Sequence, residues 1–461
     1  MARTKTTETS SITAAQLADG DLIPVIDVSD TTMSSTGTNK KLAKSQLAEA
    51  AGVTAHLADT DDAHDASAIS LLDSGGYWTA TDVESAFAEA PTRFAPLAGA
   101  RVVPIGDSTV IANSDSKTWG SRDVFGWAHV QSGAAWRYVA NAGVAGDTST
   151  MALARFDSAV AANSPDVVPI VVGINDAVGG VALSTYATNI KAFVAKCRQI
   201  AAMPVIFTVA PNLNTGTTQQ LIADYNDWLR QYTSQQGIPL VDTNSLLTDP
   251  SDGTYLSTYE LDGTHQNEVG AKAMGALFNT AIARFVQPWS PPMAVSNTSD
   301  ANNIVTNGLF LTNTGGLGTG WSNTSGTASI VSGSSPVKGN WQRLTDNGAA
   351  TANIRQNIVL GTVEVGDVLE FSGRVLTVQG TSTATWSLFL NCVGSTNGVT
   401  YIANANAQDV DGAFTTRATV GSGTTSLQVQ LARVCTSGGN GYTQISQVTV
   451  RNLTKRSVLT A

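Results

Sequence analysis

The stretch Val102-Val103-Pro104-Ile105-Gly106-Asp107-Ser108-Thr109 decides the fold of the middle of this chain. It begins as the short apolar run that a buried parallel strand requires, and it then breaks at a glycine. A serine follows where a strand would pass into a helix. A hydroxyl there lies at the carboxyl edge of a sheet, beside free helix N–H groups that favour developing negative charge. The stretch therefore indicates Ser108 as a candidate nucleophile, although Gly-Asp-Ser alone is also common in turns and helix caps.

Strand and helix patterns alternate on either side of this stretch, from about residue 94 to residue 286. The expected strands are 101–105, 138–141, 167–172, 204–209 and 239–241, and the clearest helices are 186–201, 219–236 and 269–285. This rhythm predicts a parallel sheet with helices on both faces. In such a sheet, reactive groups gather at the carboxyl ends of the strands.

Three further segments at expected strand ends supply what a serine nucleophile needs. A serine hydroxyl reacts slowly unless a neighbouring base takes its proton, and the base in turn needs an orienting group. His265 is the candidate base, and Asp262, three residues earlier, can bond its Nδ1. The tetrahedral intermediate needs hydrogen-bond donors. Candidates are the backbone N–H groups of Ser108 and Gly146 and the side-chain amide of Asn175.

These segments together resemble the SGNH, or GDSL, hydrolase family. Gly106-Asp107-Ser108 is similar to the first block of the family. Gly173-Ile174-Asn175-Asp176 is similar to its third block and Asp262-Gly263-Thr264-His265 to its fifth, in the same order along the chain. The resemblance covers residues from about 100 to 286. It implies a flavodoxin-like three-layer α/β fold and ester hydrolysis that uses no metal or other cofactor.

The second block is the looser match. It falls on Ala145-Gly146-Asp147-Thr148-Ser149, and Gly146 is preferred to Gly143 as the donor because Gly-Asp-Thr is the form that several members of the family show. Each segment also has a purely structural interpretation, as a helix cap, a turn or a capping pair. All of them together, in one order, favour a catalytic site.

Composition limits the remaining possibilities. A chain of 461 residues is too long for one core, so several domains are expected. The net charge of −10 argues against a nucleic-acid partner, and no apolar stretch approaches the roughly 20 residues that would span a bilayer. The four histidines are scattered without neighbours at ligand spacing, so no metal site is predicted. Residues 1–8 are not followed by the apolar core of a secretory signal.

Residues 1–95 differ from the rest because they contain few large apolar side chains. Residues 22–28 are an expected strand, and residues 40–51 have helical spacing. A segment of this composition would be disordered as a monomer, or ordered by winding with copies of itself. Residues 21–42 resemble the amino-terminal part of bacteriophage tail proteins, and residues 56–70 resemble a segment of phage tail fibres. The resemblance implies a virion-attachment stalk and a homotrimer.

Residues 297–461 lose the helical periodicity that characterises the expected hydrolase domain at 96–290. Short alternating runs separated by Gly, Ser, Thr and Asn predict a β-sandwich. Residues 303–310 and 354–372 resemble jelly-roll carbohydrate-binding modules. The candidates for stacking on sugar rings are Trp321, Trp341 and Trp386, although buried tryptophans are the commoner case in sandwiches. Two cysteines of this region, Cys392 and Cys435, are candidates for a disulfide.

The leading hypothesis is a serine esterase carried on a phage tail. It removes acyl groups, O-acetyl above all, from polysaccharide at the host cell surface. Its partners are then that glycan and other tail or baseplate proteins, and host lysis releases it without a secretion signal. One alternative is a receptor-binding fibre whose hydrolase-like domain only holds glycan. The other is a free secreted polysaccharide esterase with its binding module.

Overall fold

The computed structural model describes most of residues 99–455 and two short segments before them. The described residues are 22–27, 38–43, 99–112, 114, 118–214, 216–298, 303–346, 352–361, 363–381, 384–394, 399–404, 409–435 and 439–455. The chain divides into two compact units, Met1–Ala95 and Pro96–Ala461.

In the first unit, β1 (Leu22–Asp27) and β2 (Thr38–Ala43) form an antiparallel pair. The strand expected at residues 22–28 corresponds to β1. The helix expected from residue 40 is wrong at its start, because residues 40–43 pair with β1 instead and satisfy their backbone groups across the ladder. The expected stalk and the segment at 56–70 otherwise lie outside the described residues.

The second unit begins with an α/β part. Its strands are β3 (Arg101–Val102), β4 (Ile105–Gly106), β6 (Arg137–Tyr138), β7 (Ala142–Gly143), β8 (Val167–Val171), β9 (Met203–Phe207) and β10 (Leu240–Val241). Its helices are α4 (Ser108–Ile111), α5 (Val124–Gln131), α6 (Ser149–Ala154), α7 (Phe156–Ala159), α8 (Ile174–Val178), α9 (Leu183–Gln199), α10 (Thr217–Gln236), α11 (Thr243–Leu247) and α12 (Glu268–Ile282), with one 3₁₀ turn at Ala161–Asn163.

All pairings in this sheet are parallel. β3 and β4 act as one strand interrupted at Val103–Pro104, since proline has no N–H to donate to a ladder, and β6 and β7 form a second interrupted strand. Counting each pair as one strand, the order across the sheet is second, first, third, fourth, fifth. This is the flavodoxin-like order, in which ligands bind where the order reverses, between the first and third strands.

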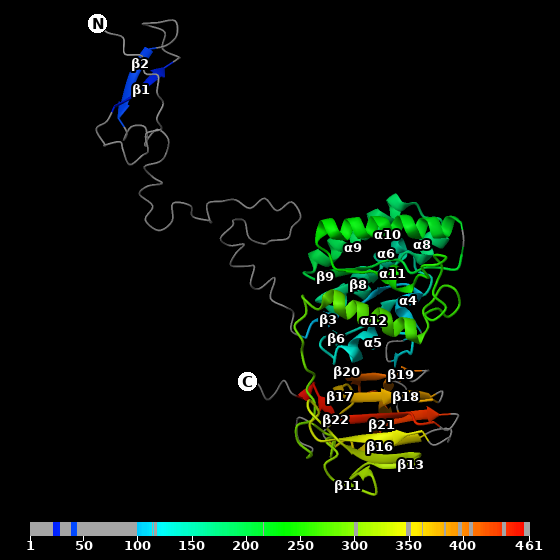
Figure 1. Ribbon diagram of the computed structural model, residues 1–461. Coiled ribbons are helices and arrows are strands. Elements are labelled where there is room, and N and C mark those ends of the chain that lie inside the picture. Colours follow the sequence, from blue (N-terminus) through cyan, green and yellow to red (C-terminus); the bar gives the residue numbers. More distant parts are fainter. Residues whose placement is uncertain are drawn as a thin grey trace. The chain divides into compact units, whose positions relative to one another are not determined.

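Successive residues of each strand point to opposite faces of the sheet and contribute to two separate cores, one on each face. Val102, Val167 and Val205 pack with α5 and α12. Val103, Val168 and Ile206 pack with α9 and α10 on the other face. The three layers are visible in Figure 1, with α9 and α10 on one side of the sheet and α5 and α12 on the other.

The remainder of the second unit is all β. Its strands are β11 (Asn313–Thr314), β12 (Leu317–Gly318), β13 (Ser322–Ser325), β14 (Thr327–Ser332), β15 (Asn340–Thr345), β16 (Ala352–Ile358), β17 (Val368–Val378), β18 (Ala384–Val393), β19 (Val399–Asn404), β20 (Val410–Thr419), β21 (Ser426–Cys435) and β22 (Tyr442–Asn452). Two sheets, β13-β16-β21-β18-β19 and β14-β15-β22-β17-β20, are antiparallel throughout.

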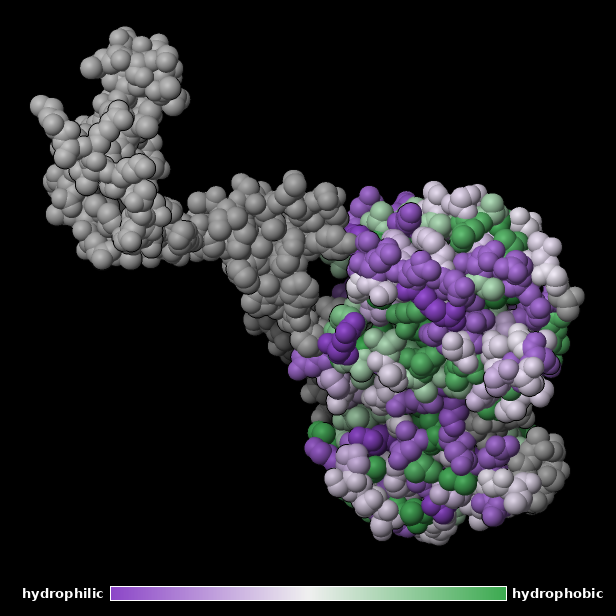
Figure 2. Space-filling view, turned by 45° about the horizontal axis from the view of Figure 1, so that its top comes forward, coloured by the Kyte–Doolittle hydropathy of each residue, from purple (hydrophilic) through white to green (hydrophobic). Residues whose placement is uncertain are grey.

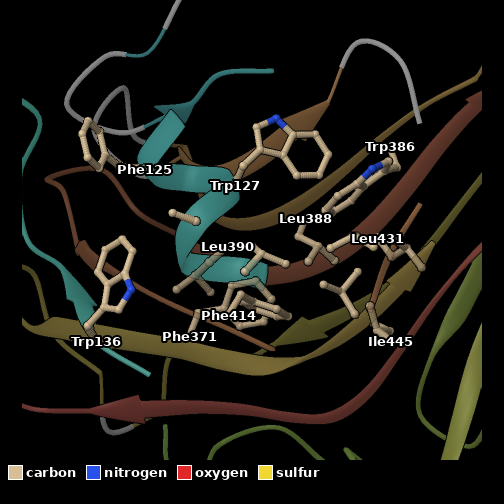
Figure 3. Close-up of a cluster of buried hydrophobic side chains, with 14 of the residues drawn as sticks. Phe125, Trp127, Trp136, Phe371, Trp386, Leu388, Leu390, Phe414, Leu431 and Ile445 are labelled. Atoms are coloured by element: carbon tan, nitrogen blue, oxygen red, sulfur yellow. The ribbon is translucent and has the colours of Figure 1, made fainter. Parts of the chain in front are cut away.

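The two β sheets share one core, and that core continues into the α/β part. Leu388 and Leu431 of the first sheet pack with Phe371 and Ile445 of the second, and the same cluster reaches Phe125 of α5 (Figure 3). The all-β region that the alternating pattern predicts is therefore present. It is joined to the α/β part through apolar contacts and is not a separate body on a linker.

Backbone hydrogen bonds also join the two parts. His129 of α5 is fully buried, and its Nε2 accepts a hydrogen bond from the backbone N–H of Thr415 in β20 at 3.2 Å. In addition, β5 (Thr118–Trp119), which follows the α4 helix, pairs in parallel with β19 and so extends a sheet of the β part. The α/β part thereby contributes a strand to its neighbour.

The two cysteines that were candidates for a disulfide do not form one. Cys392 and Cys435 are both buried thiols. Cys435 pairs with Ala384 at one end of the β18–β21 ladder, whereas Cys392 pairs with Leu427 near the other end. The two sulfur atoms are therefore much too far apart to bond.

The surface of the second unit is mainly hydrophilic on the face drawn in Figure 2, with smaller apolar areas between the polar ones. Within the described part of the chain, no helix combines the length and apolar character that crossing a membrane requires.

Candidate active site

Ser108 is the first residue of α4 and lies two residues after Gly106, the end of β4. The turn between strand and helix depends on Gly106, because a Cβ there would lie 2.1 Å from the carbonyl oxygen of Val171 in β8. Asp107 caps the helix, and its carboxylate accepts the backbone N–H of Thr109 at 2.9 Å. The strand end thus packs closely against β8 and presents Ser108 at the carboxyl edge of the sheet.

The structure brings Ser108, His265 and Asp262 together. The Nε2 atom of His265 lies 2.8 Å from the Oγ of Ser108. Its Nδ1 lies 2.9 Å and 3.0 Å from the two carboxylate oxygens of Asp262. These distances are those of hydrogen bonds, across 157 positions of sequence between serine and histidine.

One tight loop fixes the carboxylate and the imidazole relative to each other. The Oδ1 atom of Asp262 accepts the backbone N–H groups of Thr264 at 3.1 Å and of His265 at 3.0 Å, besides the ring. Burial alone would raise the pKa of Asp262, but its bonds to the ring and backbone N–H of His265 outweigh burial and hold the pKa below its usual value. The orienting group is therefore a carboxylate at neutral pH.

The predicted donors of the oxyanion hole lie on the neighbouring strand ends. Asn175 is in the first turn of α8, after β8, and its Nδ2 donates to the carbonyl oxygen of Asp147 at 2.9 Å. That bond uses one of the two amide hydrogens. Gly146 is exposed at a positive φ of 83°. Among the described residues, no acceptor takes the backbone N–H of Ser108 or of Gly146.

Gly143 is poorly placed to donate its backbone N–H to the oxyanion, the role for which Gly146 is preferred. Its N–H already donates to the Oδ1 of Asn141 at 2.9 Å. It is also buried in β7, where a Cβ would lie 2.4 Å from the backbone nitrogen of Ile111. The close packing explains why position 143 is a glycine. Because the N–H of Gly143 is already bonded, the exposed Gly146 is the better candidate donor.

Two buried carboxyl groups lie behind the site. Asp176 accepts the backbone N–H of Ser149 at 2.7 Å and its hydroxyl at 2.6 Å, which ties α8 to the start of α6. Burial raises the pKa of Asp107 to about 6, against the opposing effects of the Thr109 bonds and of nearby His265. Neither carboxyl group is a hydrogen-bond partner of the serine hydroxyl or of the imidazole ring.

Sequence reasoning missed Gln266, the residue after the candidate base. Its side chain is buried, and its Nε2 donates to the carbonyl oxygens of Thr109 at 3.0 Å and Arg122 at 3.2 Å. The histidine loop is thereby attached to the nucleophile helix. Only its place beside His265 hinted at this role, since its two partners lie far away in the sequence.

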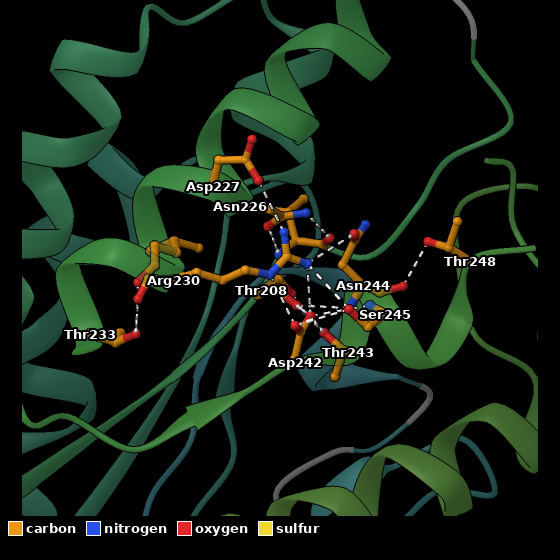
Figure 4. Close-up of polar contacts among 12 residues, drawn as sticks. Thr208, Asn226, Asp227, Arg230, Thr233, Asp242, Thr243, Asn244, Ser245 and Thr248 are labelled. Carbon is orange, nitrogen blue, oxygen red and sulfur yellow. Dashed lines mark hydrogen bonds and ion pairs between the residues drawn. The ribbon is translucent and has the colours of Figure 1, made fainter. Parts of the chain in front are cut away.

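A second polar cluster forms at the ends of β9 and β10 (Figure 4). Arg230 of α10 bonds both carboxylate oxygens of Asp242, at 3.0 Å and 3.1 Å, and Asp242 also caps α11 through the N–H of Ser245. Burial would raise the pKa of Asp242, but Arg230 and Ser245 lower it overall. Asp242 therefore has a structural role that the sequence did not reveal.

His129 does not take part in the site. It packs edge-on against Trp136, with ring centroids 5.1 Å apart, and burial lowers its pKa to about 3. It is a neutral structural residue between the α/β part and β20. Within the described part of the chain, no group of three or more His, Cys, Asp or Glu side chains is arranged to hold a metal ion.

The three tryptophans that were candidates for stacking on sugar rings are buried. Trp321 and Trp341 are each 6% exposed, and Trp386 is 1% exposed. Trp321 packs against Phe310, with ring centroids 5.0 Å apart, and Trp386 belongs to the shared core. The proposed sugar-binding role is therefore wrong for all three, because none presents a free ring face.

The doubly wound sheet, with a Ser–His–Asp relay where its strand order reverses, defines a serine hydrolase domain. A comparison with family models identifies its class: residues 105–273 match the GDSL-like Lipase/Acylhydrolase family. The matched segment begins one residue before Gly106 and extends past His265 into α12. The α/β part of this chain is a serine ester hydrolase domain of the SGNH type.

Three of the solved structures to which this chain is similar are a lipolytic protein, an esterase and a lipase. A protein from Desulfitobacterium hafniense assigned to the G-D-S-L lipolytic family is 27% identical, covers 40% of this chain and 99% of its own, and has a TM-score of 0.35. An acetylxylan esterase from Geobacillus stearothermophilus is 22% identical, with 40% and 95% covered and a TM-score of 0.35. A GDSL-like lipase from Bacteroides thetaiotaomicron is 21% identical, with 43% and 97% covered and a TM-score of 0.34. A comparison with curated proteins found no match.

Proposed function

We propose that the chain is a phage tail-associated esterase that removes O-acetyl groups from polysaccharide at the host cell surface. The observation that carries the chemistry is the contact of 2.8 Å between Ser108 Oγ and His265 Nε2, with Asp262 on the far side of the ring. A hydroxyl in this arrangement has a base to take its proton and a carboxylate to stabilise the imidazolium that forms.

The reaction proceeds in two halves. As the Oγ of Ser108 attacks the acetyl carbon, its proton passes to the Nε2 of His265, and the carbonyl oxygen becomes an oxyanion. The intermediate collapses, the C–O bond to the sugar breaks, and the sugar oxygen leaves with the proton from His265. Water, deprotonated by His265, then attacks the acetyl-enzyme. Acetate leaves, and Ser108 recovers its proton.

The oxyanion needs donors that are in place before the charge develops. The backbone N–H groups of Ser108 and Gly146 are available for it, and so is the second hydrogen on the Nδ2 of Asn175. Loss of one such donor typically lowers the rate by about 10²–10³-fold. Three donors from three strand ends would account for much of the catalysis.

An open site suits an ester carried on a polymer. The Asp262 side chain is 49% exposed and that of His265 29% exposed, and Gly146 is on the surface. Exposed apolar side chains lie on segments that follow the strand ends or flank the histidine loop: Val144, Leu213 and Leu261 in loops, Met151 in α6 and Val178 in α8. Such side chains can pack against an acetyl methyl group and the C–H faces of sugar rings, and the attached β part extends the surface on which a chain could lie.

The location on a virion rests on the resemblance of residues 21–42 and 56–70 to phage tail proteins and fibres. A tail-borne esterase requires no secretion signal of its own, since host lysis releases the particle. Light scattering of the full chain in solution tests this part separately. A trimer would support the stalk, whereas a monomer would favour a free polysaccharide esterase.

The enzymatic test measures acetate released from an O-acetylated surface polysaccharide by the full chain, with the chemically deacetylated glycan as the blank. We expect acetate release by the wild type and none above background by Ser108→Ala. Ser184→Ala, at an exposed position on α9, is the matched control and should retain full turnover. Release of acetate by Ser108→Ala, or hydrolysis of simple esters but of no acetylated glycan, would contradict the proposal.

A further inference from the structure

Arg155, which follows α6, connects three strand-end segments of the active site. Its Nε donates to the carboxylate of Asp147 at 2.6 Å, its Nη1 to the carbonyl oxygen of Ala142 at 2.5 Å, and its Nη2 to the carbonyl oxygen of Gly106 at 2.8 Å. The side chain is 21% exposed and the carboxylate of Asp147 only 7%. A planar guanidinium with several fixed donors holds three acceptors in one arrangement, which a lysine ammonium does not.

Each of the three acceptors belongs to a segment that carries part of the site. Gly106 ends β4, two residues before the nucleophile. Ala142 begins β7, the strand that pairs with β4. Asp147 directly follows Gly146 and closes a turn through its N–H to the carbonyl oxygen of Val144 at 3.2 Å. The positive φ of Gly146, at the third position of this turn, suits the glycine found there.

Asp147 also transmits this arrangement to Asn175. Its carbonyl oxygen accepts the Nδ2 of Asn175 at 2.9 Å, and that bond sets the direction of the second amide hydrogen. Its carboxylate is held by Arg155. Asp147 therefore connects the guanidinium of Arg155 to both candidate donors, Gly146 and Asn175. The bond from the same guanidinium to the carbonyl oxygen of Gly106 holds the turn before Ser108 in place relative to them.

We propose that Arg155 is the positioning residue of the oxyanion hole. Through Asp147 it sets the places of the Gly146 N–H and of the Asn175 amide relative to Ser108. It does not touch the substrate. The inference rests on the proposed function only in that Gly146 and Asn175 must be oxyanion donors, and it goes beyond that function in assigning what holds them. Donors displaced by about 1 Å would lower the rate by about 10²-fold.

The test compares Arg155→Met and Arg155→Lys with wild type on p-nitrophenyl acetate. Arg155→Met removes every donor of the guanidinium while keeping an unbranched side chain. We expect a fall in kcat of about 10²-fold with KM changed by less than about threefold, because the donors act on the transition state. Arg155→Lys keeps the charge but not the fork, and it should give an intermediate loss.

The matched control is Arg230→Met. Arg230 also pairs with an aspartate at a strand end, Asp242, but it contacts none of the segments that carry the site (Figure 4). Its loss should lower the thermal stability by an amount similar to the loss of Arg155 and leave kcat unchanged. A fall in kcat of similar size in Arg230→Met would mean that general destabilisation explains the effect, and it would overturn the inference.

A boronic acid inhibitor supplies a readout that a merely structural role would not move. Its boron accepts the oxygen of Ser108, the proton passes to His265, and a negatively charged tetrahedral adduct forms in the oxyanion hole. Across the variants, the inhibition constant should rise in proportion to the fall in kcat/KM. Unchanged boronate affinity in a variant with reduced kcat would contradict the assignment.

The failure of the inference is distinguishable from the failure of the proposed function. If folded Arg155→Met retains the wild-type kcat, Arg155 has no positioning role while the esterase stands. If the wild type hydrolyses neither p-nitrophenyl acetate nor acetylated glycan, the proposed function and the inference fail together. Should Arg155→Met not fold, Arg155→Lys and Asp147→Asn give the same comparison, and wild-type kcat in both would overturn the inference.

Discussion

The contact between the Oγ of Ser108 and the Nε2 of His265 depends on the local chemistry of one loop. Asp262 and His265 are three residues apart, and the same carboxylate accepts two backbone N–H groups and the ring N–H. Rotation of the ring would break its bond to a carboxylate that the backbone of the loop holds in place. The tautomer with a proton on Nδ1 leaves Nε2 free to accept the serine proton.

Replacing Asp262 by asparagine tests this orientation. The amide would present N–H groups to the ring, favour the wrong tautomer and remove the charge that stabilises the imidazolium. We expect kcat to fall at least about 10²-fold with KM little changed, measured on p-nitrophenyl acetate. Asp249→Asn is the control, because Asp249 forms a similar local turn with Ser251 away from the site. Equal losses in both variants would contradict the orienting role.

Replacing Asp107 by asparagine tests the buried carboxyl group beside the nucleophile. Burial raises its pKa to about 6 from 3.8, so the folded state binds its proton more tightly than the unfolded state does. Its contribution to stability is then most favourable below pH 4, decreases as the pH rises towards 6, and stays at its lower value above that.

The difference in unfolding free energy between Asp107→Asn and wild type should therefore change by about 2 kcal/mol between pH 4 and pH 7.5, in favour of the variant at the higher pH. Denaturant titrations at both values measure it. A difference that is independent of pH would mean that the buried group has an ordinary pKa.

The sequence indicated the candidate catalytic residues that the structure brings together, Ser108, His265 and Asp262. Ser108, Asn175, Asp262 and His265 stand in short motifs whose order along the chain indicated a common site. Arg155 could not be found in this way, because its partners are two backbone carbonyl oxygens and one carboxylate on three separate segments. Every residue type has a backbone carbonyl oxygen, so such an acceptor cannot be recognised from the sequence.

At the scale of elements, apolar runs located the strands of the parallel sheet, but their ends were set by backbone chemistry. The run expected at 101–105 is two short strands, since Pro104 cannot donate to a neighbour. The long helices α9, α10 and α12 were predicted to within a few residues because their apolar faces repeat at helical spacing. In the β part, much of β13 and β14 is polar and not buried, so an alternating apolar pattern marks these two strands only weakly.

The pairing of β5 with β19 was beyond prediction from the sequence. Residues 118–119 form a strand of only two residues, and their partner lies nearly three hundred positions away. Whether so short a segment forms a strand depends on the sheet edge beside it and not on its own residues. The pairing attaches β5, which follows the nucleophile helix α4 in the sequence, to the β part.

At the scale of the whole molecule, the α/β and β parts share an apolar core, which the expected boundary at 290–297 did not anticipate. Removing residues 291–461 should expose α5, including buried His129 and Val130, to water. We expect residues 96–290 alone to melt at a lower temperature than residues 96–461 and to bind a hydrophobic dye. Equal melting temperatures would contradict a shared core, and removal of residues 1–95 is the control that should change neither property.

The measurement that tests the central claim most directly is covalent labelling with a fluorophosphonate, followed by peptide mass spectrometry. We predict one phosphonylated residue, Ser108, because its hydroxyl is hydrogen-bonded to the imidazole of His265 and has N–H donors beside it. His265→Ala should label far more slowly. Labelling of a different residue, or an undiminished labelling rate in His265→Ala, would show that the 2.8 Å contact between serine and histidine is not what makes this protein reactive.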